Sequence, residues 1–243
     1  VHAGIGLYDL ESTEAGKTGE WRDGIGRVLE APRAGEVAAL LAPYLDVVAE
    51  LNEPGAPLRY YPGSPLLARK LLRRSDTLIA NELHPEDFET LKRNLKGAPS
   101  TRVMNLDAWV ALKSLLPPPE RRGLVLIDPP FEAAGEFDTL ADSLSEALRR
   151  FSTGTYIVWY PVKDAREVSR FLKRIRAFGL PKVMNAELAV CGREARSGLN
   201  ETALLIINPP YVLGEQLAVL MPHLRALLAV DAHAAFRIED WSK

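Results

Sequence analysis

The chain has very little cysteine and histidine. A single thiol, Cys191, among 243 residues excludes an internal disulfide framework and is typical of a protein of a reducing cytoplasm. One cysteine and four scattered histidines do not supply the ligands of a cysteine-rich zinc site. We therefore expect a cytoplasmic protein without a metal ion.

Long apolar runs and a strong net charge are absent as well. No stretch is long enough to span a bilayer and no secretory signal is visible, so we expect no membrane partner. The formal net charge of −2 does not identify a nucleic-acid-binding protein. Four basic clusters are explained most simply as solvated helix faces, although a protein that binds RNA could use one to contact phosphates. They are Arg69-Lys70 with Arg73-Arg74, Arg121-Arg122, Arg149-Arg150, and Lys173-Arg174 with Arg176.

The most informative stretch is Gly123 to Phe131, with the sequence Gly-Leu-Val-Leu-Ile-Asp-Pro-Pro-Phe. Its apolar run, Leu124 to Ile127, is short for a helix and rich in aliphatic side chains, which predicts a buried parallel strand. Asp128 follows the run, and the two prolines end the strand because neither can donate to a ladder. Ligands bind at the carboxyl ends of strands in open α/β sheets, so Asp128 and Phe131 are candidate site residues.

The tetrapeptide Asp-Pro-Pro-Phe resembles the signature of S-adenosylmethionine-dependent amino-group methyltransferases. An amine on an aromatic ring is a poor nucleophile because its lone pair is delocalised. Asp128 and the carbonyl group of Pro129 could accept both amine hydrogens and turn the lone pair toward a methyl donor. Phe131 would stack on a base taken out of its own stack. The structural alternative is that Asp128 caps the next helix and the prolines turn the chain.

The same pattern of strand and motif occurs a second time, at Thr202 to Tyr211. In the methyltransferase fold the last strand is antiparallel to the others, so its carboxyl end lies at the opposite edge of the sheet. We therefore interpret Asn208-Pro209-Pro210-Tyr211 as a structural turn and Asp128 as the catalytic residue.

Alternating strands and helices predict an α/β doubly wound fold. The strands after the first are predicted at Thr77–Glu82, Thr101–Ala108, Leu124–Ile127, Thr155–Pro161 and Ala186–Val190, with a seventh beginning at Thr202. Helices are predicted at Leu66–Arg73, from Leu83 onward, and at Phe137–Phe151, Ala165–Phe178 and Leu213–Leu228. Acids end three successive strands, and they are Glu82, Asp107 and Asp128. In nucleotide-binding sheets, an acid at the end of the second strand commonly binds ribose hydroxyls.

The loop Arg59 to Pro65 is rich in turn-forming residues and leads into a helix. Ser64 is a natural N-cap and Pro65 suits the first helical position. This structural explanation of Ser64 requires no ligand.

The chain begins with His2-Ala3-Gly4-Ile5-Gly6, which is typical of the end of a glycine-rich turn after a first strand. Residues 11–58 differ in composition and contain helical patterns, so we predict a small helical insertion subdomain there. We assign residues 1–10 and 59–243 to one methyltransferase domain whose N-terminal strand is missing.

Several segments together resemble one family more specifically. They are His2-Ala3-Gly4-x-Gly6, Arg59-Tyr60-Tyr61-Pro62-Gly63-Ser64-Pro65, Glu82-Leu83-His84-Pro85, the stretch from Arg122 to Pro130, and Trp159-Tyr160-Pro161-Val162. They resemble the RlmJ family of bacterial 23S (large-subunit) ribosomal RNA adenine-N6 methyltransferases, some of which are labelled as proteins for catabolism of external DNA. The resemblance implies a class I S-adenosylmethionine-dependent methyltransferase fold, Rossmann-like, with a last antiparallel strand and a small helical insertion.

The resemblance also implies roles for individual residues. Asp128 is similar to the family's catalytic acid, and Pro129, Pro130 and Phe131 complete its motif. The positions that would bind S-adenosylmethionine are His2, Gly4, Ser64, Glu82, Asp107, Ala108 and Asp128, with Glu82 contacting the ribose. Two residues depart from the family pattern, because Phe131 stands where tyrosine is commoner and Ala108 where glycine is usual. The family also has an N-terminal segment with a further donor-contacting histidine, a helix and the first strand.

We therefore expect a methyltransferase that uses S-adenosylmethionine to modify adenine N6 in large-subunit ribosomal RNA. Two alternatives remain open. The same tetrapeptide serves DNA adenine and protein glutamine methyltransferases. A non-catalytic nucleic-acid-binding protein for DNA uptake would instead bind DNA regardless of S-adenosylmethionine.

Overall fold

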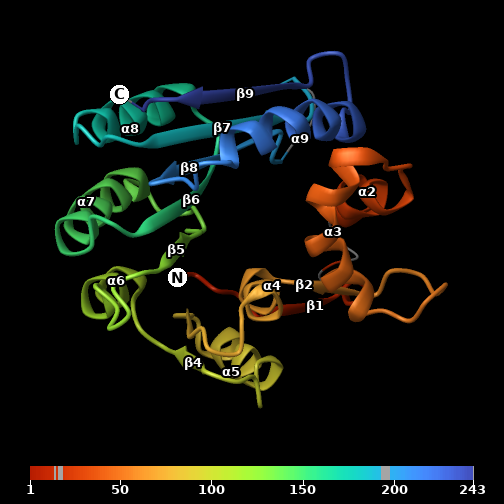
Figure 1. The fold of residues 1–243 in the computed structure, drawn as a ribbon, viewed down its shortest axis with the longest axis horizontal. Coiled ribbons are helices and arrows are strands. Elements are labelled where there is room, and N and C mark those ends of the chain that lie inside the picture. Colours follow the sequence, from red (N-terminus) through yellow and green to blue (C-terminus); the bar gives the residue numbers. More distant parts are fainter. Residues whose placement is uncertain (14, 16–18, 193–197, 243) are drawn as a thin grey trace. The chain divides into compact units, whose positions relative to one another are not determined.

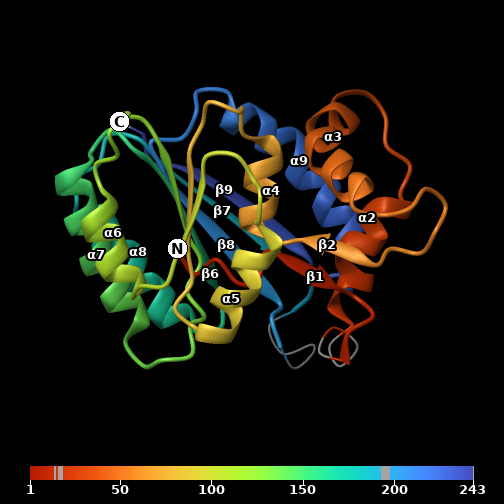
Figure 2. The same ribbon diagram turned by 90° about the horizontal axis from the view of Figure 1, so that it is seen from below.

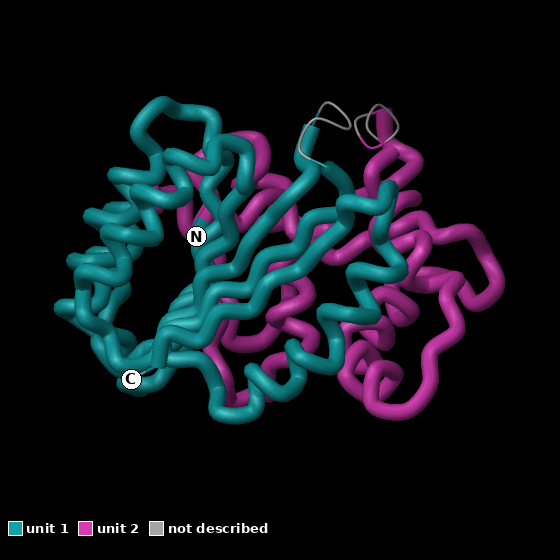
Figure 3. Tube along the Cα trace, turned by 90° about the horizontal axis from the view of Figure 1, so that it is seen from above, with its two compact units in different colours: residues 1, 109–243 teal, residues 2–108 magenta. Residues whose placement is uncertain are grey.

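The computed structural model describes residues 1–13, 15, 19–192 and 198–242, and these form two compact units (Figure 3). Unit 1 contains residue 1 and residues 109–243, and unit 2 contains residues 2–108. The division into a methyltransferase domain and an insertion at residues 11–58 stays a prediction. In the part of the chain that is described, no helix has the length and apolar character to cross a membrane.

Unit 1 is built on a five-stranded sheet of order β5-β6-β8-β7-β9 (Figure 1). Its strands are β5 (Leu124–Ile127), β6 (Thr155–Pro161), β7 (Val183–Ala189), β8 (Glu201–Ile207) and β9 (Ala235–Asp240). Strands β5 and β6 are parallel, whereas β8 is antiparallel to both of its neighbours, β6 and β7. Strand β8 is thus the antiparallel strand that the sequence predicted, and its carboxyl end lies at the opposite sheet edge from that of β5.

Helices cover both faces of this sheet. They are α6 (Ala108–Leu115), α7 (Glu136–Arg150), α8 (Ala165–Arg176) and α9 (Leu213–Leu228). Side chains alternate along β6, so Tyr156, Val158 and Tyr160 all point into the fully buried core under α7 and α8. On the other face, Met184 reaches Gly214 of α9. Figure 2 shows α7 and α8 on one side of the strands and α9 on the other.

Helix α8 illustrates why these segments are helical. Its apolar residues recur at the spacing of one helix face and are all buried, and they are Val168, Phe171, Leu172 and Ile175. Asp164 caps the helix because its carboxylate accepts hydrogen bonds from the backbone N–H groups of Arg166 and Glu167, at 2.7 and 3.4 Å.

Unit 2 contains two small sheets. Strands β3 (Leu78–Asn81) and β4 (Thr101–Met104) are parallel, and β1 (Leu7–Asp9) and β2 (Tyr60–Pro62) are antiparallel. Its helical segments are η1 (Arg22–Gly26), α2 (Arg27–Glu30), α3 (Gly35–Glu50), α4 (Ser64–Leu71) and α5 (Pro85–Asn94). A core cluster joins Ala80 of β3 to Leu91 and Leu95, at the end of α5.

Several strands differ from the sequence prediction. Strand β4 ends at Met104, four residues before the predicted end at Ala108, and β1 was not predicted. Strand β7 begins at Val183, three residues before the predicted start. Strand β2 lies inside the predicted loop, because its three residues pair with β1. Strand β9 was not predicted, since its half-exposed, charged sequence lacks the apolar run of a central strand.

The predicted N-cap at Ser64 is wrong. Helix α4 begins at Ser64 itself, its cap residue is Gly63, and no side chain makes a cap hydrogen bond. A Cβ atom on Gly63 would lie 3.0 Å from the ring of Tyr8 and 3.2 Å from the Cα atom of Gly6. Only glycine fits this close approach of two backbones, so a glycine occupies the cap position.

Arg69 is a structural residue and does not belong to a solvated cluster. Its side chain is only 7% exposed. It donates hydrogen bonds of 2.7 to 3.1 Å to the carbonyl groups of four residues, Leu72, Arg73, Asp76 and Pro99. The guanidinium group therefore joins the end of α4 to the loop before β4.

We expect Arg69→Lys to lower the free energy of unfolding by about 2 kcal/mol or more, because one ammonium group cannot reach four separated carbonyl groups. Urea unfolding of the purified variant measures this loss. Arg74→Lys is the matched control, since Arg74 is exposed and we expect a change within about 0.5 kcal/mol. Equal stability of the two variants would contradict the role of Arg69.

Candidate active site

Asp128 lies directly after β5, one residue beyond the Ile127–Val158 pair of the β5–β6 ladder. The sharp stop at Pro129 and Pro130 leaves its carboxyl group half-buried at the carboxyl end of the strand. Burial raises the pKa of the Asp128 carboxyl group, because its charged form loses contact with water. Its carboxylate is consequently a better hydrogen-bond acceptor than that of an exposed aspartate.

Phe131 ends the motif in the left-handed backbone region, with φ of 53°. Its half-buried ring packs against Phe137 with 4.7 Å between ring centroids, and against Trp159 with 6.2 Å. A non-glycine residue in this region is strained, and such strain is retained where surrounding contacts hold it. The direction of the Phe131 ring is therefore fixed by neighbours from α7 and β6.

Glu136 begins α7, directly after the loop that carries Phe131. Burial raises the pKa of the Glu136 carboxyl group, and the backbone N–H groups of Ala133, Glu132 and Phe131 oppose that effect. Sequence reasoning missed Glu136, whose only signal is its place at the start of a helix.

The aromatic contacts continue behind Phe137. The ring of Phe137 lies 5.2 Å from Phe171 and 6.1 Å from Tyr160, and Tyr160 lies 5.6 Å from Phe171. The aromatic residues of β6 are visible in the sequence, but their contact with Phe131 is not. This cluster is the packing support of the motif.

A series of hydrogen bonds joins Tyr160 of this cluster to β7 and β9. The Tyr160 hydroxyl group donates to Asn185 Oδ1 at 2.7 Å, and Asn185 Nδ2 donates to Glu187 Oε1 at 2.8 Å. Arg237 of β9 completes the series with two hydrogen bonds of 3.0 Å to the Glu187 carboxylate. Burial raises the pKa of the Tyr160 hydroxyl group, so this group stays protonated and remains a donor.

A surface pocket of about 120 Å³ opens beside the motif. Its lining includes Phe131 together with Lys163, Asp164, Arg170 and Phe171. Four carboxylates, Glu136, Asp138, Asp164 and Glu167, also line it, so the pocket combines an aromatic surface with two cations and four acids.

In unit 2, Glu82 stands at the carboxyl end of β3 and organises two turns. Its Oε2 atom accepts a hydrogen bond from the Gly4 N–H group at 2.8 Å, and its Oε1 atom accepts one from the His84 N–H group at 2.9 Å. Gly4 has φ of 62°, and a Cβ atom there would lie 2.5 Å from the Tyr8 hydroxyl oxygen. The structure thus brings Gly4 and Glu82 together, and each carboxylate oxygen keeps a lone pair for a further donor.

Two asparagines fix the loop that carries Asp107. The fully buried Asn81 side chain donates to the carbonyl group of Leu106 at 2.9 Å and accepts from its N–H group at 3.1 Å. Asn105 donates to the carbonyl groups of Glu82 and Leu83, both at 2.8 Å. Sequence reasoning missed both asparagines. Their signal is a polar amide at the end of an apolar strand.

Apart from Asp128, the remaining predicted donor-binding residues also lie in unit 2. Asp107 is exposed directly before α6, whereas the side chain of Ala108 is buried and leaves only its backbone for a ligand. Burial lowers the pKa of His2 to about 4, so its imidazole is neutral at pH 7. The Ser64 hydroxyl group makes no cap hydrogen bond. Acids beside a neutral histidine suit a cationic ligand such as a sulfonium compound.

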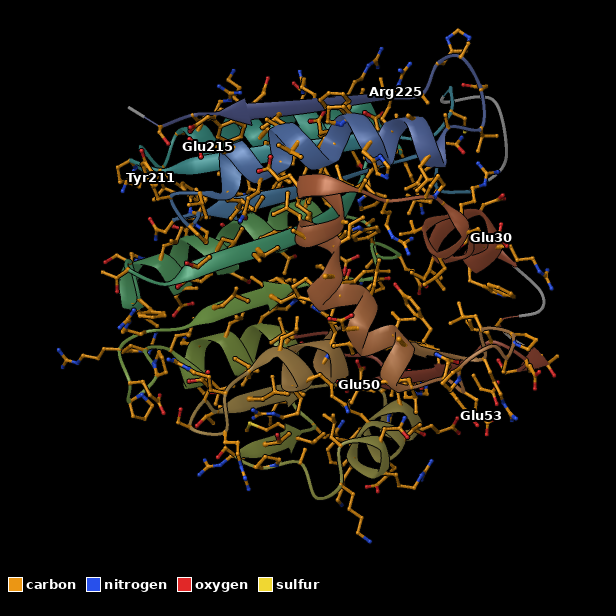
Figure 4. The ribbon with its side chains drawn as sticks, turned by 45° about the vertical axis from the view of Figure 1, so that its right-hand side comes forward. Glu30, Glu50, Glu53, Tyr211, Glu215 and Arg225 are labelled. Carbon is orange, nitrogen blue, oxygen red and sulfur yellow. The ribbon has the colours of Figure 1, made fainter. Side chains whose placement is uncertain are left out.

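The second motif makes structural contacts. Asn208 also has a left-handed backbone, with φ of 53°, and its amide donates to the carbonyl groups of Ser152 at 2.9 Å and Gly154 at 2.8 Å. Tyr211, which follows the two prolines, is 95% exposed and points away from the body of unit 1 before α9 (Figure 4). Asn208 therefore serves the turn before β6.

The predicted site residues are thus divided between the units. Unit 1 holds Asp128 to Phe131, and unit 2 holds His2, Gly4, Ser64, Glu82, Asp107 and Ala108. Among the described residues, no three of the histidine, cysteine, aspartate and glutamate side chains gather closely enough to hold a metal ion.

Comparison with known proteins shows the relatives of this chain. The ribosomal RNA large subunit methyltransferase J of Haemophilus influenzae is 38% identical over 239 residues, which cover 98% of this chain and 84% of the relative. The enzyme of the same name from Escherichia coli is 40% identical over 241 residues, covering 99% and 84%. A crystal structure of a Legionella pneumophila protein matches with a TM-score of 0.88 and 32% identity, over 100% of this chain and 87% of that one.

These relatives and the sheet order confirm the predicted fold class, a Rossmann-like class I methyltransferase fold with an antiparallel strand. A family model described as ribosomal RNA large subunit methyltransferase D, RlmJ, matches residues 1–242. The chain therefore belongs to the RlmJ family of ribosomal RNA large subunit methyltransferases.

Proposed function

We propose that this chain transfers a methyl group from S-adenosylmethionine to the N6 amine of an adenine in 23S ribosomal RNA. The observation that carries the proposal is the half-buried carboxyl group of Asp128, held at the end of β5 beside the fixed ring of Phe131, in a member of this family. The names of its relatives support large-subunit ribosomal RNA as the partner. Ribosomal RNA is made in the bacterial cytoplasm, so a cytoplasmic location is part of the proposal.

The acceptor chemistry belongs to Asp128, Pro129 and Phe131. The Asp128 carboxylate and the Pro129 carbonyl group accept the two amine hydrogens, which directs the nitrogen lone pair away from the ring. Half-burial strengthens these hydrogen bonds, because less water competes for the carboxylate. Once nitrogen has formed its bond to the methyl carbon, Asp128 is the nearest base of the motif for the proton that leaves the amine. The flipped adenine stacks on the ring of Phe131.

Donor binding belongs to unit 2. S-adenosylmethionine, when bound, would supply a methyl group on a positively charged sulfonium, and transfer of this methyl group to the amine nitrogen would break the carbon–sulfur bond and release the neutral thioether S-adenosylhomocysteine. Glu82 accepts hydrogen bonds from the ribose hydroxyl groups through its remaining lone pairs. Asp107 and the backbone of Ala108 bind the adenine end, and the Gly4 N–H group holds the Glu82 carboxylate in place. His2 and Ser64 offer uncharged polar groups, which do not repel the sulfonium charge.

Methyl transfer from labelled S-adenosylmethionine tests the proposal directly. The full-length protein should label protein-free large-subunit ribosomal RNA, and digestion should recover the label as N6-methyladenosine. DNA and a protein mixture serve as parallel substrates, because the same tetrapeptide acts on all three classes. Label in DNA or protein alone would overturn the RNA assignment. DNA binding that ignores S-adenosylmethionine, without any label, would favour the uptake protein.

The two proline-proline motifs should respond differently to the same substitution. Asp128→Ala should lower kcat by about 100-fold or more, because it removes the acceptor that orients the amine. Asn208→Ala should cost about 1 to 2 kcal/mol of stability through its two lost hydrogen bonds, while the folded protein keeps its kcat. Single-turnover assays and thermal unfolding of both variants measure the difference. Unchanged kcat in Asp128→Ala would refute the catalytic role.

The pH dependence follows from the raised pKa of Asp128. Methyl transfer needs the ionised carboxylate, so kcat/KM should fall as pH decreases through this pKa, with a midpoint above that of an exposed aspartate. Asp128→Asn should remove this acidic limb along with most of the activity. Ionisation of a half-buried carboxyl group costs stability above its ordinary pKa, so Asp128→Asn should be at least as stable as the wild type at pH 7. A kcat/KM profile that is the same for both proteins would contradict the assignment.

A further inference from the structure

Helix α8 and the turn before it carry a row of cations. Arg166, Arg170 and Lys173 follow one another at intervals of four and three residues, which places them on one side of the helix, and Lys163 directly precedes the cap residue Asp164. The buried residues, from Val168 to Ile175, occupy the opposite side. We name these four residues the α8 cationic row, and all of them are exposed.

The other two basic residues of α8 form ion pairs with acidic residues. Arg174 forms ion pairs with Asp138 and Asp142 of α7. Arg176 pairs with Glu239 at 2.8 Å and lies over the ring of Trp241. These two cations are therefore part of the packing of α8 against its neighbours.

The α8 cationic row keeps most of its charge available. Arg170 lies 3.8 Å from Glu167, but the two side chains are 76% and 49% exposed, and such surface pairs contribute little. Lys163, Arg166 and Lys173 form no ion pair with any residue that the structure describes. The nearby Asp164 carboxylate accepts the cap hydrogen bonds of the helix. The face is thus positive within a chain whose net charge is −2.

The row is continuous with the Asp-Pro-Pro-Phe motif. Lys163 and Arg170 line the same pocket as Phe131. Arg166 to Lys173 spans seven residues, or about 10 Å along the helix, which is the length of about three nucleotides of stacked strand. Proteins that bind single-stranded nucleic acids combine a positively charged surface, which contacts the phosphates, with aromatic rings on which bases stack.

We propose that the α8 cationic row binds the phosphates of the RNA strand that flanks the target adenosine. This inference rests on the proposed function and adds a phosphate-binding surface to it. The nucleotide next to the target lies on the exposed side of the row, and Lys163 and Arg170 neutralise its phosphate. Arg166 and Lys173 hold the phosphates that follow. The row contacts backbone only, so it strengthens binding without reading base sequence.

The test is the triple variant Arg166→Gln/Arg170→Gln/Lys173→Gln in the full-length protein. Its binding to a single-stranded RNA of about 20 nucleotides is measured from low to moderate salt, together with steady-state methylation of protein-free large-subunit ribosomal RNA. We expect the slope of log affinity against log salt to become shallower by about 2, since each phosphate contact contributes about 0.7. KM for RNA should rise about tenfold or more at low salt, whereas kcat and S-adenosylmethionine binding stay unchanged.

A matched triple variant controls for the loss of three charges. Arg122→Gln/Arg149→Gln/Arg150→Gln removes exposed arginines before β5 and β6, at the amino ends of these strands. We expect this control to keep the salt slope and the KM of the wild type. Equal effects of the two triple variants would overturn the inference, since net charge alone would then account for binding. An unchanged KM for RNA in the α8 variant would also overturn the inference. The same holds if the α8 variant loses as much affinity for polyglutamate as it loses for RNA.

If the wild type labels ribosomal RNA and the α8 variant does so with the same KM, only the phosphate-binding surface is refuted. If the wild type labels no RNA at all, the proposed function itself fails.

Discussion

The parallel pairing of β5 with β6 is the constraint on which the motif in unit 1 depends. The ladder runs in register from the Leu124–Thr155 pair to the Ile127–Val158 pair. The next residue of each strand is therefore Asp128 on one side and Trp159 on the other. Because the two prolines stop β5 at this point, the chain leaves the sheet and folds Phe131 back onto Trp159. A shift of the register by one residue would direct Asp128 toward the other face of the sheet.

In unit 2, polar side chains fix the loops at the strand ends, as aromatic rings fix the Asp-Pro-Pro-Phe motif in unit 1. Both oxygens of Glu82 and the amides of Asn81 and Asn105 bind backbone groups at the carboxyl ends of β3 and β4. The buried Asn81 amide must be hydrogen-bonded, so it fixes the conformation of the loop after β4, and the exposed Asn105 amide joins this loop to the one after β3. A ligand that binds these loops finds them already ordered and loses less conformational entropy on binding.

Sequence reasoning located the elements whose apolar pattern is dense. The bounds of β5, β6 and α9 agree with those predicted, because each has an uninterrupted apolar or helical pattern between strong turn signals. It failed at β9, which alternates charged and apolar residues at an edge, and at the cap of α4, where a close approach of two backbones favoured Gly63.

The support of the motif could not be predicted in the same way. Tertiary structure alone brings these partners together. Phe131 contacts Phe137 and Trp159, and Glu82 accepts a hydrogen bond from Gly4. Local propensity carries no information about such partners. What the sequence did show was the chemistry of the strand ends, since acids after buried strands are visible without knowledge of their neighbours.

Among the residues that the structure describes, strand β9 pairs with β7 alone and ends the five-stranded sheet. The backbone groups along its outer side are a template for a strand from another molecule, which makes such edges sites of aggregation. Arg237 and Glu239 place opposite charges in the middle of this edge and bind one another at 3.3 Å. The arginine that completes the series of hydrogen bonds from Tyr160 thus also protects the protein against intermolecular strand pairing.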